Sequence, residues 1–236
     1  MDLTRLIKVY ILQLGVGGIF FLFIAVLILQ RSRKKLNIVF SMFFISVALG
    51  IITNVIYASI SIEPLINVVK FLHILTFYLF TLAQVFLLTF NLILLKSEAI
   101  FGTLKQFLMI IIYSALLSIL FLVGMFGGVQ LDPSTDWEPV WKLPFLLTVL
   151  GICIPTLIIP ILYFSLQIYN TFKNEELKRK WKFFLIGILL YFLMWAGTTI
   201  SNYLAEQLVR DLWAIIAFVS LLSTYTIYYG VGKQIN

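Results

Sequence analysis

The feature that most constrains this chain is a succession of apolar stretches, each about 20 residues long, joined by short polar connections. A bilayer with about 30 Å of hydrocarbon requires an apolar helix of about this length to cross it. Continuous apolar character also favours helices over the strands of a membrane barrel, in which apolar and polar residues alternate. The seven predicted spans are Val9–Leu29, Ile38–Ser59, Phe71–Leu95, Phe107–Met125, Leu143–Tyr169, Phe183–Leu204 and Leu212–Gly230.

The composition agrees with a membrane protein. Hydrophobic residues make up 62% of the 236 residues, charged residues only 11%, and the mean hydropathy is +1.07. These values are too apolar for a water-facing surface. No Pro/Gly/Ser-rich linker or charged block divides the chain. We therefore expect an all-α, multi-pass protein of the cell membrane, with residues 1–236 forming a single bundle of seven transmembrane helices.

Positive charge is unevenly divided between the two sets of connections, which predicts the orientation of the chain. Twelve of the 17 lysines and arginines lie in the first, third and fifth connections and in the C-terminal tail. The opposite set holds the other five, together with acidic residues such as Asp132, Asp136 and Glu138. Because basic loops are retained in the cytoplasm, the N-terminus is predicted outside and the C-terminus in the cytoplasm.

The basic connections are also the predicted docking surface for a cytoplasmic partner. A pI near 9.5 does not indicate nucleic-acid binding here, because the charges are divided among short loops and form no continuous groove. Attraction to anionic membrane lipids, worth about 1 kcal/mol per residue near the surface, explains them more simply. The candidate partner-binding residues are Arg31, Arg33, Lys34, Lys35, Lys178, Arg179 and Lys180.

The sequence contains few side chains and no common motif that could take part in catalysis. We therefore expect neither an enzyme nor a metal or cofactor site. It has one histidine and one cysteine, Cys153, which lies within the fifth predicted span. It lacks His-Glu-x-x-His, Gly-x-Ser-x-Gly and phosphate-binding Gly-Lys-Ser/Thr motifs. No span carries a carboxylate at its middle, which argues against a proton or ion pump.

Neutral polar residues recur at helical spacing within three spans. In the third span His73, Gln84 and Asn91 are eleven and seven residues apart, which at about 100° per residue places them within roughly 20° of one line. Similar stripes occur in the sixth and seventh spans, and all are expected to point into the bundle. The residues of those two stripes are Trp195, Thr198, Thr199 and Asn202, and Ser220, Ser223 and Thr224.

Two interpretations of the stripes remain open. Neutral amides and hydroxyls commonly link membrane helices by hydrogen bonds of about 0.6 to 2 kcal/mol. Alternatively, those in the outer half of the bundle line an outward-opening ligand pocket with apolar walls and a few polar groups. The candidate ligand-binding residues are Asn54, Tyr57, His73, Phe77, Gln84, Trp195, Thr198 and Asn202.

Other features favour structural roles. The longest outer connection, Gln130–Trp141, is turn-forming, and its tryptophans, Trp137 and Trp141, are expected to form an interfacial belt beside solvated acids rather than a ligand lid. Pro155 and Pro160 should kink the fifth span, either as static shape or as a hinge. Small residues permit close approach of helices within the chain or in a homodimer. They are Gly15, Gly17 and Gly18, Gly124 with Gly128, and Gly197 with Ser201.

The chain resembles the seven-helix N-terminal sensor region of prokaryotic membrane histidine kinases and related signalling proteins. The resemblance covers most of the chain and rests on Lys70–Ile74 leading into an aromatic helix that ends at Phe90–Asn91. It rests also on Tyr169–Thr171, followed by Leu177–Lys180 and Phe183–Gly187. It implies a region that senses a ligand or a membrane state and passes a change to a cytoplasmic kinase or cyclase domain.

No such output domain follows the seventh span before Asn236, so we expect a stand-alone sensor or receptor-like protein that signals through a separate partner. It would bind a small or lipidic ligand from the outer side. A small transporter or permease subunit, which needs polar stripes across the whole membrane, is one alternative. A structural or assembly subunit without any ligand is another.

Overall fold

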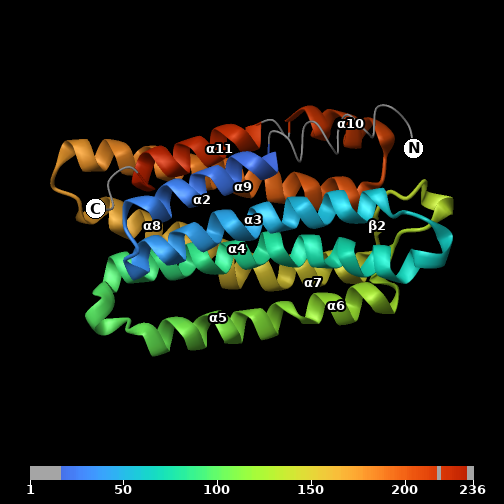
Figure 1. Cartoon of the computed structure of the whole chain (residues 1–236), viewed down its shortest axis with the longest axis horizontal. Coiled ribbons are helices and arrows are strands. Elements are labelled where there is room, and N and C mark those ends of the chain that lie inside the picture. Colours follow the sequence, from blue (N-terminus) through green and yellow to red (C-terminus); the bar gives the residue numbers. More distant parts are fainter. Residues whose placement is uncertain (1–16, 217–218, 233–236) are drawn as a thin grey trace.

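A computed structural model describes residues 17–216 and 219–232 of the chain. The described part is an elongated bundle whose helices run approximately along one axis (Figure 1). The elements in chain order are α2 (Ile19–Arg31), α3 (Lys35–Ser59), η2 (Glu63–Leu65), α4 (Ile66–Ile100), α5 (Thr103–Leu117), α6 (Ile119–Val123), η3 (Gly124–Gly128), β1 (Val129–Gln130), η4 (Pro133–Thr135), β2 (Val140–Trp141), α7 (Leu143–Cys153), η5 (Ile154–Ile158), α8 (Ile159–Thr171), α9 (Glu175–Leu204), α10 (Gln207–Ile216), α11 (Val219–Ile227) and η6 (Tyr228–Gly232).

Within residues 17–216 and 219–232, five helices are long and apolar enough to cross a membrane, and they overlap the second to sixth predicted spans. The helices extend beyond the apolar residues on which the predictions rested. They are Lys35–Ser59, Glu63–Ser97, Thr103–Gly128, Leu143–Thr171 and Glu175–Leu204.

The first and seventh predicted spans correspond to shorter described helices. Residues 9–16 of the first span lie outside the described residues, and α2 accounts for the remainder. The seventh span corresponds to α10, α11 and η6, with residues 217–218 outside the described part. Figure 1 shows α10 and α11 following one another along the bundle, beside α9. Seven crossings therefore stay a prediction.

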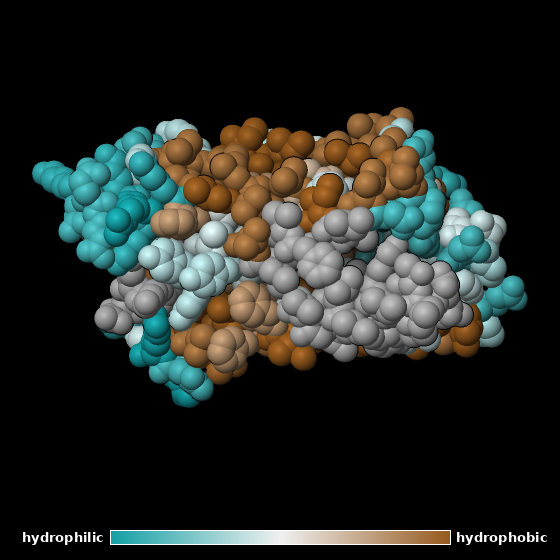
Figure 2. Space-filling model, turned by 90° about the horizontal axis from the view of Figure 1, so that it is seen from above, coloured by the Kyte–Doolittle hydropathy of each residue, from teal (hydrophilic) through white to brown (hydrophobic). Residues whose placement is uncertain are grey.

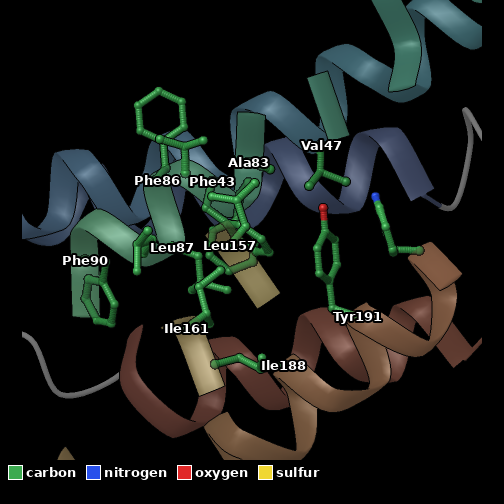
Figure 3. Close-up of a cluster of buried hydrophobic side chains, with 14 of the residues drawn as sticks. Phe43, Val47, Ala83, Phe86, Leu87, Phe90, Leu157, Ile161, Ile188 and Tyr191 are labelled. Atoms are coloured by element: carbon green, nitrogen blue, oxygen red, sulfur yellow. The ribbon is translucent and has the colours of Figure 1, made fainter. Parts of the chain in front are cut away.

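The core lies where α3, α4, α8 and α9 meet, and aromatic rings fill much of it (Figure 3). Phe40 of α3 stacks on Phe90 of α4 with ring centroids 4.6 Å apart, and Phe43 meets Tyr191 of α9 edge-on at 5.2 Å. Edge-to-face and offset pairs of this kind add about 0.5 to 1.5 kcal/mol each beyond their burial. This packing holds α4 at the centre of the bundle.

The outer surface is apolar along most of the bundle and polar at its two ends. Figure 2 shows hydrophilic residues gathered at both ends and hydrophobic residues between them. Exposed large side chains are frequent on α5, among them Leu104, Phe107 and Ile112. A contiguous apolar surface of this extent is expected where lipid is the solvent.

The two ends of the bundle collect different connections, as Figure 1 shows. The α2–α3, α4–α5 and α8–α9 connections lie at one end, which we call the basic end because it carries Arg31–Lys35 and Lys178–Lys180. The α3–α4, α6–α7 and α9–α10 connections lie at the other, which we call the hairpin end because it carries β1 and β2.

The helix of the fifth predicted span is disturbed at Pro155, whereas Pro160 lies in the first turn of α8, where a proline fits. α7 and α8 are joined through η5, a π-helical turn that contains Pro155. Proline lacks the amide hydrogen that an α-helix requires, and a wider turn relieves the clash of its ring with the preceding turn. The hydroxyl of Tyr113 on α5 donates to the carbonyl oxygen of Thr156 at 3.1 Å, which satisfies one of the backbone groups in this turn.

The connection 130–141 is more ordered than the sequence indicates. β1 and β2 pair antiparallel, with Val129 opposite Trp141 and Gln130 opposite Val140. At the tip, Asp132 caps η4 by accepting from the backbone N–H of Ser134 at 2.9 Å. A short hairpin thus closes the end of the bundle between α6 and α7.

Glycines let the C-terminal helices pack closely on α9. A Cβ at Gly197 would lie 2.0 Å from the ring of Trp213 on α10, and one at Gly187 would lie 2.6 Å from Ile227 on α11. The hydroxyl of Ser223 donates to the carbonyl oxygen of Gly187 at 2.9 Å. The close approach predicted for Gly197 therefore occurs within the chain.

Candidate ligand-binding site

The polar line of the third predicted span points into the bundle, as expected. His73 is 4% exposed, and Gln84 and Asn91 are fully buried on the same face of α4. Asn91 is tied to α8, since its Nδ2 donates to Ser165 Oγ at 2.7 Å and to the carbonyl oxygen of Ile161 at 3.3 Å. The residues of this line do not share one role, because their surroundings differ along α4.

At the hairpin end, His73 is held between two aromatic side chains from other elements. The indole N–H of Trp141 on β2 donates to His73 Nε2 at 3.0 Å, and the hydroxyl of Tyr57 on α3 lies 3.4 Å from His73 Nδ1. An indole nitrogen can only donate, so Nε2 must accept and the imidazole hydrogen resides on Nδ1. The histidine is thereby fixed as a neutral ring with its Nδ1–H directed at Tyr57.

Phe77 and Trp195 extend this group towards the centre of the bundle. Phe77 lies one turn beyond His73 on α4, with its ring centroid 4.7 Å from that of Trp141 and 5.8 Å from that of Trp195 on α9. We call Tyr57, His73, Phe77, Trp141 and Trp195 the aromatic cluster. It joins α3, α4, β2 and α9, and all five side chains are buried.

Trp141 corrects an expectation from the sequence. The side chain is 1% exposed and lies inside the bundle, whereas an interfacial belt position was expected. The reason is the register of the hairpin, which turns Trp141 inward against Phe77 and Phe145. Trp137 is half-buried and packs near Val55 and Leu131.

Two buried polar groups, one in the aromatic cluster and one two turns further along α4, have no hydrogen-bond partner among the described residues. They are the indole N–H of Trp195 and the complete amide of Gln84, in which neither Nε2 nor Oε1 is satisfied. Leaving a buried donor or acceptor unpaired costs about 1 to 3 kcal/mol, and native proteins rarely tolerate it without a reason. Gln84 lies two turns from Phe77 along the same face of α4.

The remaining predicted site residues lie outside the aromatic cluster. Thr198 accepts from the indole N–H of Trp213 at 3.2 Å and donates to the carbonyl oxygen of Met194, so its hydroxyl joins α10 to α9. Asn202 follows one turn later on α9 and is half-buried. Asn54 is half-buried on α3, one turn before Tyr57.

An ion pair missed by the sequence reasoning ties α10 to the hairpin. Arg210 is 12% exposed in its side chain; one guanidinium nitrogen contacts the Glu138 carboxylate, and the other donates to the carbonyl oxygen of Pro139 at 2.8 Å. Glu138 was expected to be solvated and is instead paired. The opposite charges of the two connections were visible in the sequence, but their separation of 72 residues concealed the contact.

At the hairpin tip, hydrogen bonds stabilise the charged form of Asp132. The pKa of this carboxyl lies below its ordinary value, chiefly because the side chain of Ser134 donates to it, with further donation from Gln130 and from the backbone. Burial acts in the opposite direction and raises the pKa, but by less than the hydrogen bond from Ser134 lowers it. The tip is therefore a fixed, negatively charged turn.

The predicted partner-binding residues all lie at the basic end, and several interact locally. Lys180 pairs with Glu176 at 2.6 Å, and Lys178 lies 3.9 Å from Glu175. Lys35 donates to Thr103 Oγ1 at 2.7 Å, which links α3 to α5. Of the predicted partner-binding residues, the exposed ones are Arg31, Arg33, Lys34, Lys35 and Arg179.

In comparisons with protein families, with curated proteins and with solved structures, nothing matches this chain.

Proposed function

We propose that this protein is a membrane sensor or receptor-like protein whose ligand enters from the hairpin end and whose signal passes to a separate partner at the basic end. In this proposal the bundle crosses the cell membrane seven times, with the hairpin end outside and the basic end in the cytoplasm.

The observation that carries the proposal is the pair of unsatisfied buried groups, the Gln84 amide and the Trp195 indole N–H. A ligand with hydrogen-bonding atoms would satisfy them and so offset the free-energy cost of burying them without a partner. Apolar rings surround these groups, which favours a small or lipidic molecule that combines a polar group with a hydrocarbon body.

Coupling to the rest of the molecule would use contacts around the aromatic cluster. Trp141 bonds His73 on α4, and the same hairpin holds α10 through Glu138 and Arg210. A ligand that displaces Phe77 or Trp195 would therefore shift the hairpin and the C-terminal helices that pack on α9. Such a shift would reach the basic end along α9 and α11.

The test is ligand-induced thermal stabilisation of the purified protein in detergent. The probe is decanamide, which has donors and an acceptor on an apolar chain, with decane as the probe that lacks polar atoms. Decanamide should raise the melting temperature of the wild type by several degrees, whereas decane should not.

The decisive variant is Gln84→Leu. It should raise the melting temperature without ligand, because it removes two unsatisfied atoms, and it should abolish the response to decanamide. Thr89→Val is the control, since this buried hydroxyl on α4 bonds only its own helix, at Val85. An equal response in Gln84→Leu and wild type, or none in wild type, contradicts ligand binding at Gln84 and favours a structural subunit.

Asn91 favours a second candidate, a small transporter or permease subunit. Its Oδ1 is buried and unpartnered, further along the same face of α4 towards the basic end. A polar line that continues in this direction is what a pathway across the membrane requires. The two candidates differ in how far along α4 an aqueous reagent can reach.

A further inference from the structure

The two unsatisfied groups of the proposed ligand site are shielded from the hairpin end by Trp141. Trp195 and Gln84 are both buried, and so is Trp141, which packs on Phe77 and bonds His73 from the hairpin at that end of the bundle. A molecule that enters from the hairpin end therefore has to displace Trp141 first.

Arg210 of α10 holds the chain just before Trp141. One of its terminal guanidinium nitrogens contacts the Glu138 carboxylate, and the other donates to the carbonyl oxygen of Pro139 at 2.8 Å. We call Arg210, Glu138 and Pro139 the clasp. Its two contacts to the hairpin are charge-assisted and come from one side chain, so they fix the strand that carries Trp141. Figure 1 shows the hairpin and the start of α10 at the same end of the bundle.

α10 also joins the clasp to the part of α9 that carries Trp195. Trp213 lies about one turn after Arg210 on α10, and its indole N–H donates to Thr198 Oγ1 at 3.2 Å. Thr198 in turn lies about one turn after Trp195 on α9. The hairpin and the proposed site are therefore linked through α10.

The hairpin has little internal support and a hinge at its base. Its strands contain two residues each, and an isolated hairpin is only marginally stable without contacts to other elements. Gly127, in the turn η3 that leads into β1, has a φ of 97°, and nothing lies within 4 Å of a Cβ placed there. An uncrowded glycine with this backbone can absorb a change in the direction of the chain.

The clasp itself is incomplete. Arg210 Nε is buried and has no hydrogen-bond partner among the described residues. A buried donor without a partner raises the free energy of the closed arrangement, and water would satisfy this donor once the hairpin moved away. Opening therefore offsets part of the free energy that is lost when the two contacts of the clasp break.

We propose that the hairpin is a lid over the ligand site, which the clasp holds closed and which opens when Arg210 releases its two partners. Opening withdraws Trp141 from the aromatic cluster and gives a small or lipidic molecule access to Trp195 from the hairpin end. This inference rests on the proposed function, because the lid controls entry to the same site.

The test measures how fast a buried thiol reacts from the water side, in the full-length chain in neutral detergent with Cys153→Ala. Thr199→Cys is the reporter, because Thr199 is buried on α9 one turn beyond Trp195 towards the hairpin end, and its hydroxyl donates to a carbonyl oxygen of its own helix. Thr89→Cys is the matched reference on α4 towards the basic end, buried and bonded within its helix in the same way. The reagent is a charged methanethiosulfonate, which does not enter apolar regions.

With the clasp intact, Thr199→Cys should react far more slowly than free cysteine in solution. Arg210→Gln removes both contacts of the clasp and should speed this reaction about tenfold, the change expected when hydrogen bonds from a charged group are lost. Glu138→Gln, which spares the bond to the carbonyl oxygen of Pro139, should give a smaller increase. Thr89→Cys should keep its rate in both variants.

Lys180→Gln is the matched control, since it breaks an ion pair with Glu176 at the basic end. It should leave the rate at Thr199→Cys unchanged. An unchanged rate in Arg210→Gln would overturn the lid, and so would an equal acceleration at Thr89→Cys, which would mean general loosening of the bundle. The predicted rates without any thermal response to decanamide would contradict the proposed ligand site alone.

Discussion

His73 shows how one polar residue within an apolar bundle is accommodated. Both of its ring nitrogens face specific neighbours, Trp141 at Nε2 and Tyr57 at Nδ1, and the imidazole is packed edge-on against Tyr57. A buried polar group costs little when its partners are fixed in this way. Gln84 lies about three turns further along α4 and has no such partners among the described residues. This contrast separates a structural residue from a candidate ligand contact.

Trp141→Phe should destabilise the protein by about 1 to 3 kcal/mol, because His73 Nε2 would lose its donor while remaining buried. Equilibrium unfolding in mixed detergent measures this loss. In a His73→Phe background the same substitution should cost less, since the hydrogen bond is already absent. An identical cost in both backgrounds would show that packing alone accounts for the effect.

At the residue scale, the sequence predicts the buried polar line but not what each residue contacts. The spacing of His73, Gln84 and Asn91 follows from helical geometry, so the inward direction was predictable. The position of Trp141 beside His73 depends on the register of a hairpin with only two residues in each strand. Such short strands have no periodic pattern from which the facing side can be read.

The side chains of Arg210 and Trp213 hold α10 in place. Arg210 binds Glu138 and Pro139, and Trp213 lies on Gly197 and donates to Thr198. A helix of this length is held by tertiary contacts more than by its own propensity. The contacts explain why small and polar residues occur together at this point of α9.

Gly197→Ala should destabilise the protein by about 1 to 3 kcal/mol, because the new methyl group would overlap the Trp213 ring and displace α10. Gly151→Ala is the control. Nothing lies within 4 Å of a Cβ at Gly151, so alanine there should be neutral or stabilising by up to about 1 kcal/mol. Thermal unfolding compares the two, and equal effects would contradict the packing of α10 on α9.

The hairpin tip should lose stability in acid. The Asp132 carboxyl has a pKa lowered by hydrogen bonds from Ser134, so its contribution is complete above the ordinary range of an aspartate and falls as pH drops through the lowered native value. Asp132→Asn should therefore differ from wild type in melting temperature at neutral pH, and this difference should vanish at low pH. A difference that is constant with pH would show that the charge of Asp132 is irrelevant.

At the element scale, long apolar runs were sufficient to predict the long helices between Lys35 and Leu204, but two of these helices begin well before the predicted residue, at Glu63 instead of Phe71 and at Glu175 instead of Phe183. The π-helical turn η5 was foreseeable as a disturbance from Pro155, but its form depends on the neighbouring Tyr113. The backbone of α4 breaks at Ser97, where φ is 61°. No glycine or proline at this position predicts the break from the sequence. Local sequence does not encode features that arise from contacts between elements.

The described part of the molecule has an apolar outer surface between polar ends, and its connections divide between those ends. Which end faces the cytoplasm stays a prediction. The division of the connections into two sets could be predicted from the sequence, because loops rich in basic residues alternate along the chain with loops that contain acidic residues. The number of crossings does not follow from the sequence in the same way, since α10 and α11 are each shorter than the five long helices and residues 217–218 between them lie outside the described part.

Cysteine labelling on intact cells tests the orientation, in a background with Cys153 replaced by alanine. A cysteine at Ser134, in the hairpin tip, should react with a membrane-impermeant maleimide added outside the cells. A cysteine at Asn174, which caps α9 at the basic end, should react only after the membrane is permeabilised. The reverse pattern would invert the proposed orientation.

The most direct measurement of the proposed function is the depth to which the impermeant maleimide reaches along α4. Single cysteines replace His73, Gln84 and Asn91 in the same background, and labelling from outside is followed with and without decanamide. We expect labelling at His73, protection by decanamide, and no labelling at Asn91. Labelling at all three positions would instead indicate a transport pathway, and labelling at none would contradict an outward-facing ligand site.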